Sequence, residues 1–484
     1  MPPQIATGLS LAFAAYLAAT AVYIISENRR PSATFAWMLL FFVLPGAGVI
    51  VYLLFGRKHR QFGQTATLMR QELAQRLDPV FAALRPEHAR AVHLMHPDEG
   101  SGASLAELVR NTSHSTVTTC NEVRILQNAA EAYPALIADM KAARRSIHLQ
   151  YFSWNTDELA EELFAILSAK VAEGVDVRIV YDPVGSLLML RHGYIRRMRR
   201  AGIRMEPFSK LWRLHTISYR NHRKIAVFDG CVGHTGGLNI GGEHVTPPKG
   251  FRLWRDTNIR VEGSAATLLQ AVFAVDWHNA TGEDLFQPAT FPPTPERLKH
   301  AQLPVQMTLS GPDSEWQAIR QLYFAMITSA RKRVYMQSPF FILDTSIAEA
   351  LKAAALSGVD VRVMISERGT NQYVPYWAAN TYMEEIAAAG ATVLLYEPGY
   401  LHAKTVITDG CVCSIGSANI DIRSFSINYE LNAVIYDKTL SQELEAGFLR
   451  DMADCREFTV AEYRSRNAPV RFRDSVARLF SPLM

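Results

Sequence analysis

The sequence contains few groups that would cross-link it or bind a metal. It has only five cysteines among 484 residues, an odd number, and no Cys-x-x-Cys or Cys/His spacing typical of a ligand set. Disulfides and zinc are therefore not expected, which favours a reducing compartment. A cage of carboxylates is also missing, so the sequence predicts no metal and no other cofactor. The cysteines are Cys120, Cys231, Cys411, Cys413 and Cys455.

A strong charge of either sign is absent as well. The formal net charge is +4, which gives no indication of a nucleic-acid partner. The start of the chain lacks the basic residues and the short apolar region of a signal peptide. What the composition does offer is length for two or three domains and an apolar share of 49%, enough for a soluble core and some membrane segment.

Two stretches near the N-terminus carry no charged residue. Residues 5–26 would form a helix of about 22 residues that rises roughly 33 Å, enough to cross a hydrocarbon core. Residues 32–55 form the second stretch, interrupted by Pro45-Gly46 and Gly48, which a membrane helix can absorb as a kink. The two stretches predict a transmembrane hairpin; the alternative is a pair of buried core helices.

Basic residues flank this hairpin unequally. Those after it outnumber those in its connecting loop, so the positive-inside rule predicts a cytoplasmic globular part. The residues after the hairpin are Arg57, Lys58, Arg60 and Arg70, and those in the loop are Arg29 and Arg30.

A motif of His, Lys and Asp at positions 1, 3 and 8 occurs twice, each time followed by a Gly-containing turn that ends in Asn. On a strand, residues two apart share a face, so His and Lys would point together. One copy alone would indicate only a solvated strand end. Two copies in register indicate a site for a phosphodiester. The first copy is His222, Lys224, Asp229 and Asn239, and the second is His402, Lys404, Asp409 and Asn419.

The surroundings of the motifs are duplicated too. Residues 143–152, 174–180 and 201–203 read as a helix end feeding a strand, a second strand and the start of a third, and the order returns about 180 residues later. We therefore expect an α/β fold of two duplicated α/β/α sandwich domains about a pseudo-twofold axis, with both motifs at the shared interface.

The doubled motif resembles the phospholipase D superfamily, over most of the chain after about residue 120. The stretch 416–430 resembles the cardiolipin synthase version of the second motif, and 219–224 and 236–240 agree with it. Phe340 departs from it slightly, since Tyr is often found there. The resemblance implies an enzyme of the bacterial inner membrane that transfers a phosphatidyl group from one phosphatidylglycerol to another and releases glycerol.

The chemistry of the residues agrees with that reaction. One histidine attacks phosphorus to give a phosphohistidine, and the other protonates the leaving alkoxide. The resemblance favours His222 as the nucleophile and His402 as the acid/base, and places Asp256 and Glu430 where an acidic residue fixes each histidine tautomer; a surface carboxylate is the alternative for both. Two lysines and two asparagines would hold the nonbridging oxygens.

The motif aspartates, Asp229 and Asp409, complete the catalytic motif of the family. Each directly precedes a glycine, as in a hairpin turn, so we assign both mainly to structure.

The expected domains are a transmembrane hairpin over 1–60, a helical linker over 61–120, phospholipase D-like domains over 121–295 and 296–462, and a basic amphipathic tail over 463–484. The tail either lies on the membrane or docks as a terminal helix. Leu187-Leu188-Met189-Leu190 and the basic run that follows it either meet anionic headgroups or form a solvated face; the run is Arg191, Arg196, Arg197, Arg199, Arg200, Arg204, Lys210 and Arg213.

The expected partners are phosphatidylglycerol and anionic membrane lipids, and no nucleic acid. A lipid hydrolase or another phosphatidyltransferase with the same chemistry is the main alternative function. A nuclease or a scaffold without activity is disfavoured, because the predicted hairpin argues against the former and two intact motifs against the latter.

Overall fold

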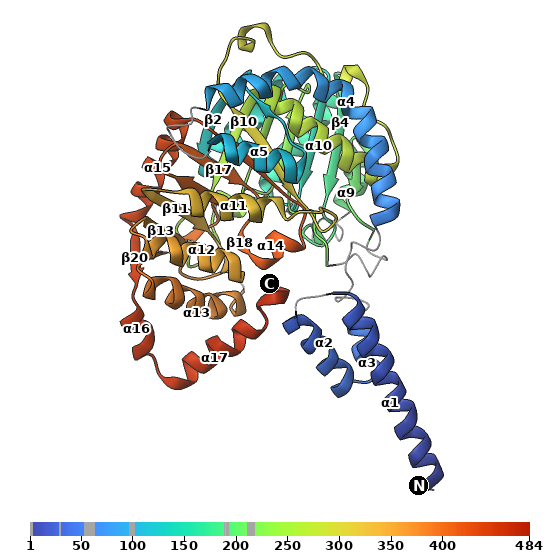
Figure 1. Ribbon diagram of the computed structural model, residues 1–484. Helices are drawn as coiled ribbons and strands as arrows, with labels where there is room; N and C mark the ends of the chain where they lie inside the picture. Colours follow the sequence, from blue (N-terminus) through green and yellow to red (C-terminus); the bar gives the residue numbers. More distant parts are fainter. Residues whose placement is uncertain are drawn as a thin grey trace. The chain divides into compact units, whose positions relative to one another are not determined.

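The structure is a computed structural model that describes residues 3–28, 31–52, 63–95, 102–187, 189, 193–210, 218–370 and 372–484 (Figure 1). The chain divides into a small unit, residues 1–61 with 211–218, and a large unit, residues 62–210 with 219–484. The expected basic residues at 29–30 and 57–60, and also Leu188, Leu190, Arg191 and Arg213, lie outside the described residues.

The small unit contains α1 (Pro3–Ser26), α2 (Pro31–Val43) and α3 (Ala47–Val51). Neither α1 nor α2 contains a charged residue. The second uncharged stretch is not one helix: it breaks between α2 and α3, where Gly46 adopts a φ of 80°. Phe41 and Tyr52 pack with Ile24 in a small apolar core. Among the described residues, no helix reaches the length and apolarity needed to cross a membrane.

The large unit contains two sheets of the same design. The first runs β2-β9-β7-β6-β3-β4-β5 and the second runs β1-β10-β19-β17-β16-β11-β13-β14-β20. From β10 to β14 the second sheet repeats the first strand by strand. In each sheet a central strand, β3 or β11, pairs parallel with the strand that follows it within the same sheet, β4 or β13, and antiparallel with the strand that follows the His-Lys motif. The predicted duplication is confirmed.

The strands and helices of the first half are β2 (Asn121–Gln127), α6 (Asn128–Ala142), β3 (Ser146–Tyr151), α7 (Glu158–Ala172), β4 (Asp176–Tyr181), α9 (Tyr194–Arg200), β5 (Arg204–Pro207), β6 (Ile225–Phe228), β7 (Val232–Gly236), β8 (Trp254–Arg255), β9 (Thr257–Gly263) and α10 (Ser264–Thr281), with the 3-10 helix η5 (Gly242–His244) before β8 and the 3-10 helices η6 (Pro288–Thr290) and η7 (Glu296–Leu298) after α10. The three strands expected from residues 143–152, 174–180 and 201–203 are β3, β4 and β5.

The second half contains β10 (Val305–Ser310), α11 (Ala318–Ser329), β11 (Arg333–Ser338), β12 (Phe341–Ile342), α12 (Thr345–Leu356), β13 (Asp360–Ser366), α13 (Val374–Ala388), β14 (Thr392–Tyr396), β15 (Tyr400–Leu401), β16 (Thr405–Thr408), β17 (Val412–Gly416), β18 (Ile420–Asp421), α14 (Ile422–Ser426), β19 (Glu430–Ile435), α15 (Lys438–Met452) and β20 (Cys455–Phe458). The helices α16 (Val460–Ser465) and α17 (Ala468–Leu479) and the 3-10 helix η8 (Ser481–Leu483) end the chain.

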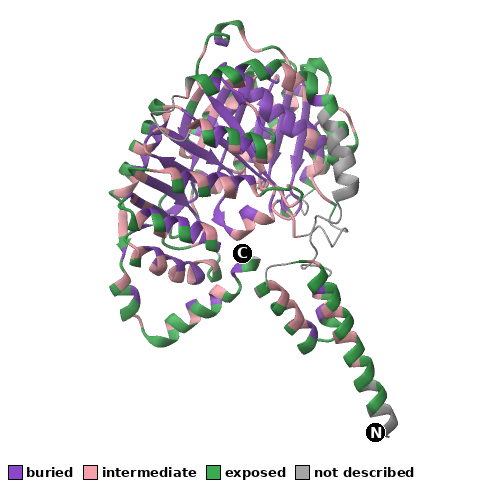
Figure 2. Ribbon diagram, in the orientation of Figure 1, coloured by how far each residue is buried: buried purple, intermediate pink, exposed green. Residues whose placement is uncertain are grey.

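The two sheets share an apolar core, and Figure 2 shows their central strands largely buried. Val227 and Ile259 of the first sheet belong to the same cluster as Ile407 and Leu431 of the second. Alternating side chains of a strand face opposite sides of the sheet. The face of each sheet that points away from the shared core therefore packs against outer helices, which are α6 and α7 in the first half and α11, α12 and α13 in the second. The halves therefore form one body with the His-Lys motifs near its middle.

The segment 61–120, expected to be a linker, joins this body. It contains α4 (Gly63–Leu94), α5 (Gly102–Ser113) and β1 (Val117–Thr118). Leu105 and Val109 of α5 pack in the core of the second half, and β1 pairs with β10. The buried Glu87 of α4 accepts hydrogen bonds from the amides of Thr119 and Cys120.

Candidate active site

Backbone hydrogen bonds join each motif to the opposite half. The amide of His222 donates to the carbonyl of Tyr429 at 2.9 Å, and the amide of Tyr429 donates to Arg220 at 2.8 Å. In the other copy, the amide of His402 donates to the carbonyl of Arg255 at 2.7 Å, next to the pairing of β15 with β8. Each histidine is thus fixed beside the residue that directly precedes a carboxylate of the other half.

The histidines and lysines do not lie on the motif strands. The sequence predicts that both residues occupy one strand face, but β6 begins at Ile225 and β16 at Thr405, one residue after each lysine. The prediction was wrong because the residues before these strands pair across the junction between the halves. The lysines turn back along the chain: Lys224 Nζ donates to the His222 carbonyl at 2.7 Å, and Lys404 Nζ to the His402 carbonyl at 2.5 Å.

Both predicted carboxylates contact a motif histidine, and each contact crosses between halves. His222 Nδ1 lies 3.0 Å from both carboxylate oxygens of Glu430, and His402 Nδ1 lies 2.7 Å from Asp256 Oδ2. Both carboxylates are 0% exposed. A carboxylate at Nδ1 selects the tautomer that carries its proton there, which leaves Nε2 as the reactive nitrogen.

The two carboxylates differ in ionisation. Burial opposes the charged form of Glu430, but His222, Lys224 and the hydroxyl of Ser417, at 2.5 Å, outweigh it and lower the pKa of Glu430. Burial dominates at Asp256 and raises its pKa, although Lys404 and a backbone amide act against it. Glu430 is therefore the more firmly ionised partner.

The two lysines are buried, and their charge depends on pH. Burial lowers the pKa of Lys224 to about 7; Glu430 opposes this shift, and Lys404 adds to it. Burial likewise lowers the pKa of Lys404 to about 8, while Asp256 and Glu430 favour its charged form. Two ammonium groups in one buried site repel each other, which an anion between them would relieve.

The surroundings of both histidines favour the neutral imidazole. Burial lowers the pKa of His222, Glu430 partly opposes it, and Lys224 adds to the lowering. Burial and the charges of both lysines bring the pKa of His402 well below its ordinary value. A neutral imidazole is the form that can attack phosphorus, whereas an acid catalyst must gain a proton when substrate binds.

The turn asparagines are held differently in the two copies. Asn239 Oδ1 accepts from the Ser153 amide at 3.2 Å. Asn419 Nδ2 donates to Asp421 Oδ2 at 3.0 Å, and its backbone amide donates to Ser424 Oγ. The contact of Asn239 with Ser153 uses its side-chain oxygen and leaves the side-chain nitrogen for other partners. The side-chain nitrogen of Asn419, by contrast, donates to the buried carboxylate of Asp421.

The motif aspartates hold the turn ahead of a neighbouring strand. Asp229 accepts hydrogen bonds from the amides of Arg144, Arg145 and Ser146, and the amide of Ser146 begins β3. Asp229 and Asp409 have φ values of 53° and 54°, each followed by a glycine with positive φ, as in a tight hairpin. Asp409 makes the equivalent contacts with the amides of Arg331, Lys332 and Arg333.

The sequence analysis did not predict several residues around the site. These residues make the surroundings of His402 differ from those of His222. The His402 ring lies among the rings of Trp254, Tyr400 and His244, with centroids 5.3, 5.7 and 6.4 Å away. Among the residues that the structure describes, His222 has one ring contact, with Phe152, whose centroid lies 5.0 Å away. Tyr400 stands two residues before His402, so its place in the motif was the available signal.

Charged groups lie on the His222 side of the site. Arg220 lies two residues before His222, as Tyr400 does before His402, and is 6% exposed and 3.6 Å from the buried Asp182. Arg423 interacts electrostatically with Arg220, Asp182 and Glu430; burial lowers its pKa. Arg423 falls inside the stretch 416–430 and could have been singled out there.

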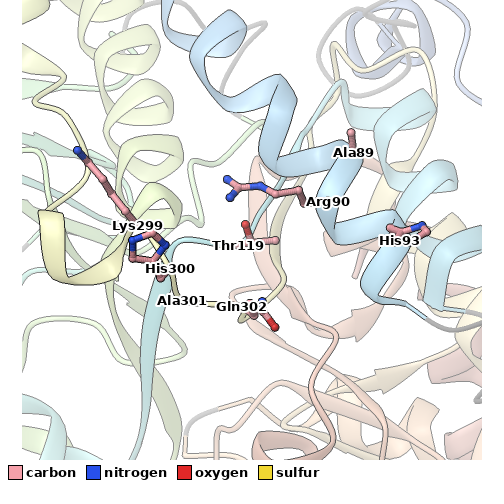
Figure 3. A pocket seen from close by; sticks show the side chains of 8 residues that line it. All are labelled: Ala89, Arg90, His93, Thr119, Lys299, His300, Ala301 and Gln302. Atoms are coloured by element: carbon pink, nitrogen blue, oxygen red, sulfur yellow. The ribbon is translucent and has the colours of Figure 1, made fainter.

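A basic pocket also lies away from the motifs (Figure 3). It has a volume of about 580 Å³ and is lined by α4 and the segment 299–302. Arg90 extends from α4 toward that segment, but the side chains of Lys299 and His93 point elsewhere. Because its positive groups do not converge, this pocket is not a second phosphate site.

Comparison with known proteins agrees with this geometry. Residues 136–277 and 323–452 match the family model described as "Cardiolipin synthase, PLD-like domain", and residues 14–57 match "Phospholipase_D-nuclease N-terminal". A cardiolipin synthase of Listeria monocytogenes serotype 4b (strain CLIP80459) is 38% identical over 474 residues, which cover 96% of each chain. The major cardiolipin synthase of Bacillus subtilis (strain 168) is 36% identical over 98% of each chain.

This chain belongs to the cardiolipin synthase family of the phospholipase D superfamily. It is an enzyme of the phosphatidyltransferase class. The predicted membership is confirmed. A solved phosphatidylserine synthase of Haemophilus influenzae shares its fold, with a TM-score of 0.60 at 15% identity, and covers 79% of this chain and 99% of its own. The duplicated α/β architecture is thus that of the superfamily.

Proposed function

We propose that the enzyme transfers a phosphatidyl group from one phosphatidylglycerol to a second and releases glycerol. The observation that carries this proposal is the pair of reciprocal His–carboxylate contacts between the halves, His222–Glu430 and His402–Asp256. Two imidazoles with opposed roles are what a two-step displacement at phosphorus needs. The names of the relatives, cardiolipin synthases, support the choice of lipid substrate.

In the first step His222 is the nucleophile. Its Nε2 attacks phosphorus as the bond from phosphorus to the glycerol oxygen breaks, and His402 gives that oxygen its proton. The attacking ring becomes cationic, and the ionised Glu430 at Nδ1 stabilises this charge. Burial and the charges of both lysines hold the pKa of His402 down in the free enzyme. A phosphodiester between the lysines offsets their charges and so favours protonation of His402 when substrate is bound.

In the second step the phosphohistidine is resolved by a lipid hydroxyl. His402, now neutral, takes the proton of the terminal hydroxyl of a second phosphatidylglycerol, whose oxygen bonds to phosphorus as the bond to His222 Nε2 breaks. Cardiolipin leaves, and both histidines return to their starting state. Water in place of the lipid hydroxyl would give phosphatidic acid.

The nonbridging oxygens are held by the two lysines and the two asparagines. The charge of Lys404 contributes to lowering the pKa of Lys224, so the two ammonium groups lie close enough to interact. The anchors of Asn239 and Asn419 at Ser153 and Asp421 fix the plane of each amide. Asp229 and Asp409 act through the hairpins that present the lysines and do not touch the phosphate.

The small unit attaches the enzyme to the cell membrane, and the globular part is cytoplasmic. What supports attachment is the absence of charge in α1 and α2, the family match over 14–57, and a set of large apolar side chains open to solvent. Among them are Leu11, Val22, Phe35, Leu39 and Phe42, each more than half exposed. Extraction of membranes with carbonate tests attachment: the enzyme remains with the lipid if the small unit is embedded.

Incubation of the purified enzyme in phosphatidylglycerol bilayers, with a chelator present, tests the reaction. We expect cardiolipin and glycerol in equal amounts, and neither product from His222→Ala or His402→Ala. Phosphatidic acid as the main product would assign a hydrolase instead, and no lipid turnover would reject both.

A further inference from the structure

The last helix of the chain is fixed against the second half by polar contacts. Asn380 of α13 donates to Asp474 of α17 at 2.9 Å, and Arg478 forms an ion pair with Glu385, also at 2.9 Å. Asp474 is 0% exposed. A buried carboxylate that accepts from a neighbouring helix sets the rotation of α17 about its axis, so the side chains on its outer face are fixed as well.

That outer face is apolar. Phe472, Val476, Leu479 and Phe480 are 72%, 38%, 77% and 50% exposed. Their spacing of four, three and one residues places them on one stripe of the helix and its end. We call these four residues the α17 face. Four large side chains held in water cost several kcal/mol relative to burial, at about 1.5 to 3 kcal/mol each, which indicates that something covers them.

The surroundings of the α17 face are basic. Residues 463–484 contain five arginines and a single acidic residue, the buried Asp474. Arg464, Arg473 and Arg478 have side chains that are 63%, 40% and 41% exposed, although each also forms an ion pair. Their partners are Glu384, Asp474 and Glu385. Apolar side chains flanked by exposed arginines are typical of a helix that lies in the interface of an anionic bilayer.

The position of α17 connects it with the active site. The helix runs along α13 (Figures 1 and 2), and η8 after it contacts α14. α14 carries Arg423 and directly follows Asp421, the partner of Asn419. A membrane that contacts the α17 face would therefore lie next to the edge of the second half that carries Asn419 of the second motif.

We propose that the α17 face inserts into the surface of an anionic bilayer and sets the edge of the large unit that carries the second motif against the lipid. This contact is independent of the proposed reaction and adds to the attachment by the small unit. Insertion brings substrate headgroups to the active site by lateral diffusion. The arginines attract the phosphate groups of the lipids, and the four apolar side chains insert among the acyl chains.

A nitroxide at Leu479 tests insertion directly in the full-length enzyme. Leu479→Cys is labelled after Cys231, Cys411 and Cys455 are replaced by serine, and the label's exposure to oxygen and to a polar nickel chelate is measured by electron paramagnetic resonance. Leu356→Cys is the matched control, because Leu356 is a leucine that is 75% exposed at the end of α12.

With vesicles of equal parts phosphatidylglycerol and phosphatidylcholine, we expect the label at 479 to gain oxygen contact and lose contact with the chelate at least threefold. The label at 356 should stay aqueous, and vesicles of phosphatidylcholine alone should give a smaller change. A label at 479 that stays aqueous would overturn the proposal. Shielding from both reagents without lipid would also overturn it, because protein, either the small unit or a second copy, would then cover the face.

A kinetic comparison separates this proposal from the reaction itself. Phe472→Ser with Leu479→Ser should raise the surface concentration of phosphatidylglycerol needed for half-maximal rate at least fivefold, with kcat changed less than twofold. Leu356→Ser should change neither. An unchanged half-saturation value would contradict insertion, whereas loss of all lipid turnover in the unsubstituted enzyme would contradict the reaction and leave the labelling result standing.

Discussion

At the scale of single residues, the two histidines differ in their carboxylate partners. Glu430 is held ionised by His222, Lys224 and Ser417, whereas burial raises the pKa of Asp256. A nucleophile that becomes cationic benefits from the firmer anion, which supports our proposal that His222, the partner of Glu430, is the nucleophile. Neither partner could be ranked from the sequence, because the difference arises from hydrogen bonds made by neighbours in space.

We expect Glu430→Gln to lower kcat by about 100- to 10,000-fold, since the amide stabilises neither the correct tautomer nor the cationic ring. Steady-state rates on phosphatidylglycerol measure this effect. Asn428→Ala serves as the control: it removes a neighbour of Glu430 at 3.2 Å and should cost far less. A kcat of the Glu430→Gln variant within threefold of the original would contradict a role for the carboxylate in orienting His222.

The pKa of Lys224 predicts how substrate binding depends on pH. The phosphodiester needs a charged ammonium, and in the free enzyme Lys224 loses its proton above about pH 7. Bound anion raises the pKa of this lysine, so the complex keeps the proton that the free enzyme loses. Apparent affinity should therefore fall as pH rises from 7 to 9, by up to about tenfold per unit.

Half-saturation concentrations between pH 6 and 9 measure this dependence, since the substrate's own charge is constant there. Lys224→Arg is the matched variant, because a guanidinium stays charged throughout. It should flatten the dependence between pH 7 and 8, below the range in which Lys404 loses its own proton, whatever its effect on kcat. Affinity that rises with pH in the unsubstituted enzyme would contradict the assignment.

At the scale of elements, the β6–β7 hairpin shows what the sequence could predict. The Asp-Gly pair signalled the turn, and the structure places Asp229 and Gly230 at positive φ in it. The alternation of helix and strand patterns along residues 143–152, 174–180 and 201–203 signalled the strands β3, β4 and β5. The exact start of β6 could not be predicted, because the residues before it are held by Tyr429 from the other half.

Asp229→Ala should mainly lower stability. It removes the acceptor for three backbone amides and leaves a non-glycine residue at a φ of 53°, a loss of about 3 kcal/mol in the free energy of unfolding. Urea denaturation measures the loss, and kcat per folded molecule should stay within about fivefold. Asp409→Ala should behave alike. Unchanged stability with abolished turnover would instead assign Asp229 to the chemistry.

At the scale of the whole molecule, the two halves complete each other's site. Period and repetition in the sequence predicted two similar domains, and the offset of the motifs predicted their common interface. The sequence did not show that Glu430 serves His222 and Asp256 serves His402, since that exchange depends on how the domains pack. Nor did it show that α5 and β1 belong to the body of the second half.

Shared packing predicts that the large unit unfolds as one. The cluster containing Val227, Ile259, Ile407 and Leu431 includes both sheets, so neither half keeps its core when the other is lost. Loss of activity and change in tryptophan fluorescence should therefore coincide in denaturant. Two separated transitions would show that the halves fold independently and that neither half needs the contacts of the shared site in order to fold.

The most direct test of the account is to trap the covalent intermediate. A phosphatidyl ester with a p-nitrophenolate leaving group needs no acid, so His402→Ala should release one equivalent of nitrophenolate per enzyme in a burst and then stall. Its adduct should map to His222, and His222→Ala should show no burst. A burst from His222→Ala with none from His402→Ala would reverse the two roles, and turnover without any adduct would contradict a phosphohistidine mechanism.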